Sequence, residues 1–146
     1  MDDPTELTSI KSWVEEWGGG VDYVDFVKLN GDLAVLAAFS RILWPRFVEV
    51  EGCVLWDRVY EESNFRLWYE NLAGEIPRIE ATLNQVRVWQ IAESGDEGQG
   101  AQEFIAACIA DSWRASLSAS FPERDFDVRV AETEDGPIVT FSSVAS

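Results

Sequence analysis

The chain combines an unusually acidic composition with enough apolar side chains to form a core. Its 146 residues contain 27 acidic and 11 basic side chains, and the formal net charge is −16 at pH 7. Seven tryptophans and an apolar fraction of 47% accompany this charge. High charge produces disorder only when hydrophobicity is low as well. The sequence therefore predicts a folded protein, and its length fits a single globular domain over residues 1–146.

The first third of the chain has the spacing of helices. Asp3 and Asp32 are typical N-caps, and apolar residues recur after each of them at helical intervals. We expect helices over 4–17 and 33–44, the first ended by three glycines and the second by a proline. Residues 21–29 fit either a short helix or a strand.

The rest of the chain alternates between strand and helix patterns. Residues 47–56 first alternate in polarity and then run apolar, which predicts one strand. Two apolar runs around residues 134–137 predict a C-terminal β-hairpin. Three more helices are expected over 64–72, from Ile76 onward with Ile79, Leu83, Val86 and Trp89 on one face, and over 101–120.

This order of elements predicts an α+β fold. About five helices would pack on a small antiparallel sheet that ends in the C-terminal hairpin. We expect the strand over 47–56 to pair with that hairpin. Cys53 and Cys108 both lie in apolar runs, so both are expected to be reduced and buried.

The N-terminus and the apolar segments indicate a protein of the cytoplasm. The first residues contain neither the basic nor the apolar region of a signal peptide. The longest apolar stretch, residues 33–39, is too short to span a bilayer. We therefore expect a cytoplasmic protein with no membrane partner.

The residue types present favour binding over catalysis. The chain has no histidine, which is the commonest general base and metal ligand. No catalytic residue, metal site or cofactor is predicted, and we expect a non-enzymatic protein. Paired carboxylates leave open a carboxylate-based enzyme or a small-ligand binder. Nucleic acid is not an expected partner, because phosphate neutralisation needs a basic surface.

An acidic surface is suited to a basic protein partner. Charge complementarity speeds association, and aromatic anchors supply much of the binding energy. Glu49 and Glu51 are two residues apart in the expected strand, so they should share a face. The predicted partner-binding residues are Glu49, Glu51, Trp56, Asp57, Glu61 and Glu62. If the interface lies elsewhere, the acidic N-terminal segment with Glu15, Glu16, Asp22 and Asp25 is the next candidate.

One segment also resembles stretches in small uncharacterised bacterial proteins. It begins with Leu33-Ala34-Val35-Leu36 and ends with Leu43-Trp44-Pro45-Arg46-Phe47-Val48-Glu49-Val50-Glu51-Gly52-Cys53. In overall character the chain is similar to immunity proteins of bacterial polymorphic toxin systems, which are small, acidic, tryptophan-rich and non-catalytic. The resemblance implies a protein that binds a cognate toxin, often a basic nuclease, and blocks it. A structural or adaptor domain with no masking role is the alternative.

Overall fold

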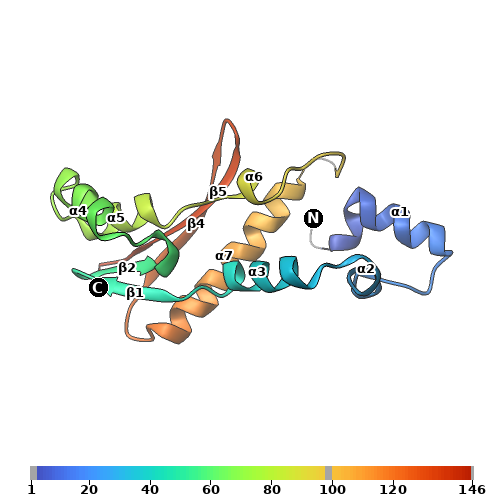
Figure 1. Cartoon of the computed structure of the whole chain (residues 1–146), viewed down its shortest axis with the longest axis horizontal. Coiled ribbons are helices and arrows are strands. Elements are labelled where there is room, and N and C mark those ends of the chain that lie inside the picture. Colours follow the sequence, from blue (N-terminus) through green and yellow to red (C-terminus); the bar gives the residue numbers. More distant parts are fainter. Residues whose placement is uncertain (1–2, 98–99, 146) are drawn as a thin grey trace.

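The computed structural model describes residues 3–97 and 100–145 and shows an α+β fold (Figure 1). The fold class and the C-terminal hairpin predicted from the sequence are confirmed. The strands are β1 (Phe47–Val50), β2 (Cys53–Trp56), β3 (Val86–Arg87), β4 (Phe126–Thr133) and β5 (Gly136–Ser143). The helices are α1 (Thr8–Trp17), α2 (Tyr23–Asn30), α3 (Leu33–Leu43), α4 (Glu62–Asn71), α5 (Ile76–Leu83), α6 (Val88–Ile91) and α7 (Ala101–Ser120).

The C-terminal hairpin forms most of a three-stranded antiparallel sheet. Its order is β3-β5-β4, so β5 is the central strand and is hydrogen-bonded on both sides. The long helix α7 packs against β4 and β5. Trp113 of α7 meets Phe141 of β5 edge to face, with ring centroids 5.6 Å apart. These aromatic contacts lie at the centre of the larger of two apolar clusters.

The single strand predicted over residues 47–56 is a β-hairpin, and this corrects the expected topology. Glu51 and Gly52 both have positive φ, at 51° and 83°, and they turn β1 back onto β2. Two such residues in succession suit a tight hairpin turn. The β1–β2 hairpin forms its own sheet, so the expected pairing with the C-terminal hairpin is wrong. β5 pairs instead with β3.

Strand β2 is buried on both faces and joins the two cores. Val54 and Trp56 belong to the larger cluster, with α7 and the C-terminal sheet. Cys53 and Leu55 belong to a second cluster with side chains of α4 and α5. Successive side chains of a strand point to opposite faces, so a four-residue apolar run serves both clusters.

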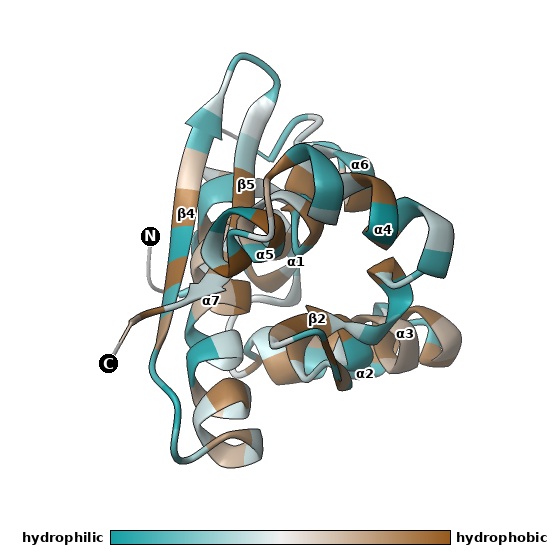
Figure 2. Cartoon of the chain, turned by 90° about the vertical axis from the view of Figure 1, so that its left-hand side faces the viewer, coloured by the Kyte–Doolittle hydropathy of each residue, from teal (hydrophilic) through white to brown (hydrophobic). Residues whose placement is uncertain are grey.

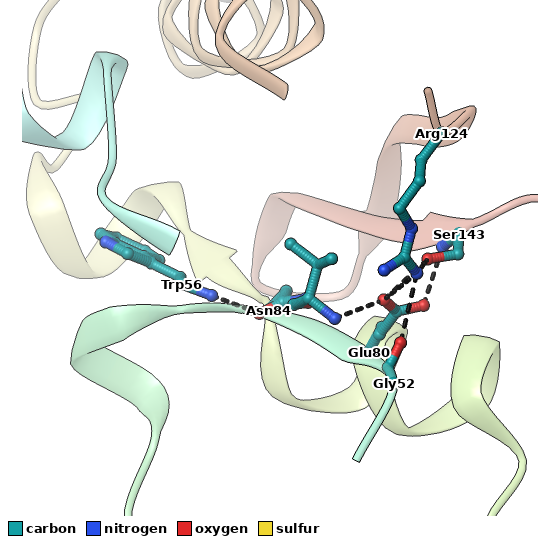
Figure 3. A network of polar contacts seen from close by, with 7 residues as sticks. Gly52, Trp56, Glu80, Asn84, Arg124 and Ser143 are labelled. Carbon is teal, nitrogen blue, oxygen red and sulfur yellow. Dashed lines mark hydrogen bonds and ion pairs between the residues drawn. The ribbon is translucent and has the colours of Figure 1, made fainter. Parts of the chain in front are cut away.

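Glu80 of α5 and Asn84, the C-cap of this helix, bond the outer edge of β2 (Figure 3). Glu80 accepts a hydrogen bond from the backbone N–H of Val54 at 2.8 Å. Asn84 accepts from the N–H of Trp56 at 2.9 Å and donates to the carbonyl of Val54 at 2.9 Å. Residues four apart share one face of a helix, so α5 occupies the place of a third strand.

The Glu80 carboxylate also holds the end of β5. It accepts hydrogen bonds from the backbone N–H and the hydroxyl of Ser143, each at 2.8 Å. Arg124 lies 4.0 Å from the carboxylate and donates to the Gly52 carbonyl at 3.2 Å and to Ser143 Oγ at 2.7 Å. One fully buried carboxylate therefore connects α5, the β1–β2 hairpin and β5.

Most of the ambiguous segment 21–29 is helical, and the helix expected over 4–17 is divided at Leu7 into a 3₁₀ turn (Pro4–Glu6) and α1. Asp3 caps the turn that precedes α1, and Asp32 caps α3. Asp22 and Asp25 form a reciprocal capping box at the start of α2. Such a box satisfies two backbone donors at once, which decides the segment in favour of helix.

Two expectations within the helices are wrong. Helix α5 ends at Leu83, so Val86 lies in β3 and Trp89 in α6 rather than on one long helix face. Asn84 leaves the helical conformation where its side chain bonds β2. Cys108 is exposed on α7, whereas Cys53 is buried as expected. Ile109, the next residue, is the one that faces the core.

Removing the Glu80 carboxylate is expected to destabilise the whole fold. Glu80→Ala leaves the buried N–H of Val54 without an acceptor and takes the carboxylate away from Arg124, so the free energy of unfolding should fall by about 3 kcal/mol or more. Glu75→Ala is the matched control, because it removes only an exposed pair with Arg78 on the same helix and should cost less than about 1 kcal/mol. Urea denaturation measures both. Equal losses would contradict the role assigned to Glu80.

The two cysteines should react with a thiol reagent at very different rates. Burial, and to a smaller extent the neighbouring Glu80 carboxylate, raises the pKa of Cys53 to about 11. Partial burial and Asp111 also raise the pKa of Cys108, but this thiol is exposed. Because the thiolate is the reactive form, Cys108 should label in the native protein and faster as pH rises from 7 to 9. Cys53 should label only on unfolding. Fast labelling that survives Cys108→Ser would contradict this assignment.

Candidate functional site

The predicted acidic residues surround the β1–β2 hairpin and the start of α4, and all of them are exposed. We call this group, Glu49, Glu51, Asp57, Glu61 and Glu62, the hairpin strip. Glu51 occupies the turn rather than a strand, and its carboxylate lies 3.8 Å from Arg66 of α4. The expectation that it shares a strand face with Glu49 is therefore wrong.

Glu61 of the hairpin strip has a structural role. It is the N-cap of α4, where its carboxylate accepts hydrogen bonds from the backbone N–H groups of Ser63 and Asn64 and from the Ser63 hydroxyl. These bonds favour the ionised form and lower the pKa of Glu61. Together with the Asp22–Asp25 capping box, this explains two of the carboxylate pairs as helix caps.

Trp56 is part of the core and is not an exposed anchor, which corrects the predicted site. Its side chain is 4% exposed and packs against Trp113 of α7, with ring centroids 5.6 Å apart. The guanidinium of Arg58 lies over the ring at 5.0 Å from its centroid. Loss of Trp56 is therefore expected to affect stability first. The hairpin strip keeps its carboxylates but loses the aromatic residue predicted to anchor a partner.

The largest group of exposed apolar side chains lies on α1–α3 and at the ends of these helices. Among the described residues, nine of the fourteen large hydrophobic side chains that are exposed fall between residues 17 and 44. We call them the N-terminal surface: Trp17, Tyr23, Val24, Val27, Leu29, Leu33, Val35, Leu36 and Trp44. Exposed apolar side chains concentrated in one segment make that segment the candidate for an interaction site.

Helix α3 contacts the core only through its last turns. Phe39, Ile42 and Leu43 pack against the larger cluster. The carbonyl of Ile42 accepts a hydrogen bond from the indole N–H of Trp113 at 2.8 Å, and the carbonyl of Leu43 accepts one from the hydroxyl of Ser112. The first two turns project from this attachment, and Figure 2 shows hydrophobic colouring along much of the helix.

The exposed turns of α3 are apolar on every side. Leu33, Val35 and Leu36 are 85%, 64% and 44% exposed. A helix that is apolar all round is normally buried. This one is not covered by any part of the chain that the structure describes. The sequence contained this signal in residues 33–39, which have no charged side chain.

Helices α1 and α2 form a small aromatic cluster beside α3. Trp13 packs against Trp17 and Phe26, with ring centroids 5.6 Å and 5.5 Å apart. This packing turns Phe26 inward and leaves Val24 and Val27 outward. At the junction of α2 and α3, Val27 and Leu36 both lie close to Gly31. The apolar side chains of the two helices therefore adjoin there.

Acidic side chains accompany the N-terminal surface. Residues 3–44 contain seven acidic and three basic residues. Glu15 and Glu16 are exposed on α1, and Asp22 and Asp32 begin the next two helices. These are largely the residues of the second candidate site from the sequence. The structure thus combines carboxylates with three exposed aromatic residues on and beside α1–α3, Trp17, Tyr23 and Trp44, whereas the exposed aromatic residue next to the hairpin strip is Tyr60.

The chain matches no protein-family model, and searches of curated proteins and of solved structures found no match. Within residues 3–97 and 100–145, no group of three or more histidine, cysteine, aspartate or glutamate side chains is placed to hold a metal ion. No helix in those ranges is long and apolar enough to cross a membrane. The candidate site is therefore identified from the exposed side chains of the N-terminal surface alone.

Charging the N-terminal surface should remove a dye-binding site without unfolding the protein. Native chain is expected to bind an apolar fluorescent dye through the exposed turns of α3, and Leu33→Asp with Leu36→Asp should weaken that fluorescence strongly. Exposed substitutions of this kind change stability by only about 0.5 kcal/mol each. Leu67→Asp, on an exposed position of α4, is the control and should leave the fluorescence unchanged. If Leu67→Asp weakened the fluorescence and the α3 variant did not, the dye would bind elsewhere.

Proposed function

We propose that this protein is a non-enzymatic binding module that masks a basic protein partner, as an immunity protein or inhibitor does. The observation that carries the proposal is the N-terminal surface: nine exposed large apolar side chains in a segment rich in carboxylates. To mask a partner, an interface must bind it with high affinity and must discriminate it from other proteins. The apolar side chains supply the first property and the carboxylates the second.

The net charge of the chain favours a basic protein, rather than a second copy of this chain, as the partner that binds the N-terminal surface. Two copies would bring like-charged segments together, each from a chain of net charge −16. Self-association of that kind is opposed by electrostatic repulsion. A basic partner would be attracted from a distance and would then bury Trp17, Leu33 and their neighbours. Attraction accelerates the encounter, whereas desolvated apolar anchors slow dissociation.

The hairpin strip is the second candidate surface for the same partner. Its five carboxylates are exposed, and Tyr60 and Leu67 are the exposed apolar residues on or near α4. This strip would strengthen attraction at long range but offers fewer anchors. Charge reversal at the two sites distinguishes them, because Glu15 and Glu16 belong to α1 whereas Glu49 and Glu51 belong to the hairpin.

The test begins with capture of partners on the tagged full-length chain, followed by binding measurements on the purified, identified partner. The expected partner is basic. Leu33→Asp with Leu36→Asp should weaken its binding by about tenfold or more, on the scale of interface hot spots. Leu67→Asp should not. Glu15→Lys with Glu16→Lys should slow association and flatten its dependence on salt.

Three outcomes would contradict the proposal or its site. A larger effect of Glu49→Lys with Glu51→Lys than of the α1 reversal would move the interface to the hairpin strip. An acidic partner, or sedimentation showing a stable homodimer through α1–α3, would refute the assigned occupant. If a basic partner binds but retains its own activity at saturating chain, the chain is an adaptor and does not mask.

A further inference from the structure

Two arginines that are not in ion pairs line the same cavity. Five of the nine arginines form ion pairs within the described residues. The other four, Arg41, Arg46, Arg58 and Arg87, are in no ion pair with any described residue, although the chain has 27 acidic side chains. Two of these four, Arg58 and Arg87, line one cavity of about 490 Å³, and no carboxylate lines it. An acidic chain thus has a cavity whose charged lining residues are both basic.

The walls of this cavity come from separate parts of the fold. Arg58 follows β2 in the short 3₁₀ turn Asp57–Val59, and Arg87 lies in β3. Apolar side chains of α3, α5, β3 and α6 complete the walls: Ile42, Leu83, Val86 and Ile91. Thr82, Gln85 and Gln90 add hydroxyl and amide groups. The wall is therefore divided evenly between apolar residues and residues with polar or charged groups, and its volume lies in the range of small-molecule sites.

The two arginines are suited to bind an oxyanion. Arg58 is supported from below by the Trp56 ring, 5.0 Å from the guanidinium carbon, which leaves its N–H groups for a ligand. Neither the Arg58 nor the Arg87 guanidinium donates a hydrogen bond to another described residue. A planar guanidinium binds carboxylate and phosphate groups through two parallel hydrogen bonds. From this we infer that the cavity binds a small organic anion that carries a phosphate or carboxylate group.

The neighbouring hollow limits the size of that ligand. Arg87, Gln85 and Gln90 also line a second hollow of about 370 Å³, and this one includes Asp135 of the β4–β5 turn. An anion that extended past Arg87 would meet the Asp135 carboxylate. The anionic group therefore belongs between Arg58 and Arg87, and the apolar remainder of the ligand lies against Leu83 and Ile91.

Calorimetry on the full-length protein tests this site. The probes are pyrophosphate, citrate and adenosine monophosphate, which separate bare phosphate, carboxylate and a phosphate on a larger organic body. At least one should bind saturably, with one site per chain. Arg58→Gln and Arg87→Gln should each weaken it by about tenfold or more. Asp135→Asn should leave binding unchanged or strengthen it.

Matched controls separate a binding role from a structural one. Arg129→Gln removes an exposed arginine of β4 that pairs with Asp127, and it should leave affinity within twofold. If the role of Arg58 were purely structural, Arg58→Gln would lower the melting temperature and leave the affinity of the folded variant for the probe unchanged. No saturable binding of any probe at millimolar concentration, or equal binding by wild type and both cavity variants, would overturn the inference. Neither result bears on the basic partner, which is assigned to α1–α3.

Discussion

The folded body depends on the way α5 bonds the outer edge of β2. This strand is buried on both faces and has one strand neighbour, so its other edge would leave backbone groups without partners. A buried unpaired N–H or carbonyl is costly. Glu80 of α5 and Asn84, the residue that caps the end of this helix, provide those partners, and Glu80 extends the network to Ser143 and Arg124. The position of α5 therefore fixes both the hairpin and the end of β5.

This arrangement has a consequence for the N-terminal helices. The core is completed by β1–β5 and α4–α7, and only the last turns of α3 are needed to cover it. Helices α1 and α2 and the start of α3 project from one end (Figure 1). Their exposed residues contribute little to stability, since an exposed apolar side chain gains little on folding. Leu33 and Val35 can therefore serve a partner without weakening the body.

Helix caps could be predicted from the sequence, whereas burial that depends on residues far along the chain could not. Asp22 and Asp32 act through donors two and three residues away, so the chain itself specifies these caps. Trp56 is buried by contacts with α7 and by a bond to Asn84, 28 residues away, and no local pattern contains that information. A buried carboxylate such as Glu80 is equally invisible, because an isolated glutamate reads as surface. The predicted site is therefore wrong at Trp56, which is buried, whereas its five acidic residues are exposed.

The separation of charge in this molecule follows from the same packing. Carboxylates on the outside remain hydrated, and their mutual repulsion is weakened by ions beyond about 10 Å. Arg58 and Arg87 are exposed to solvent, but no carboxylate lines the cavity beside them, so an anion that binds there does not compete with an acidic side chain of the wall. Arg58 is kept in that position because its guanidinium also covers the ring of Trp56. The core residue that cannot serve as a protein anchor therefore supports the guanidinium that we infer to bind an anion.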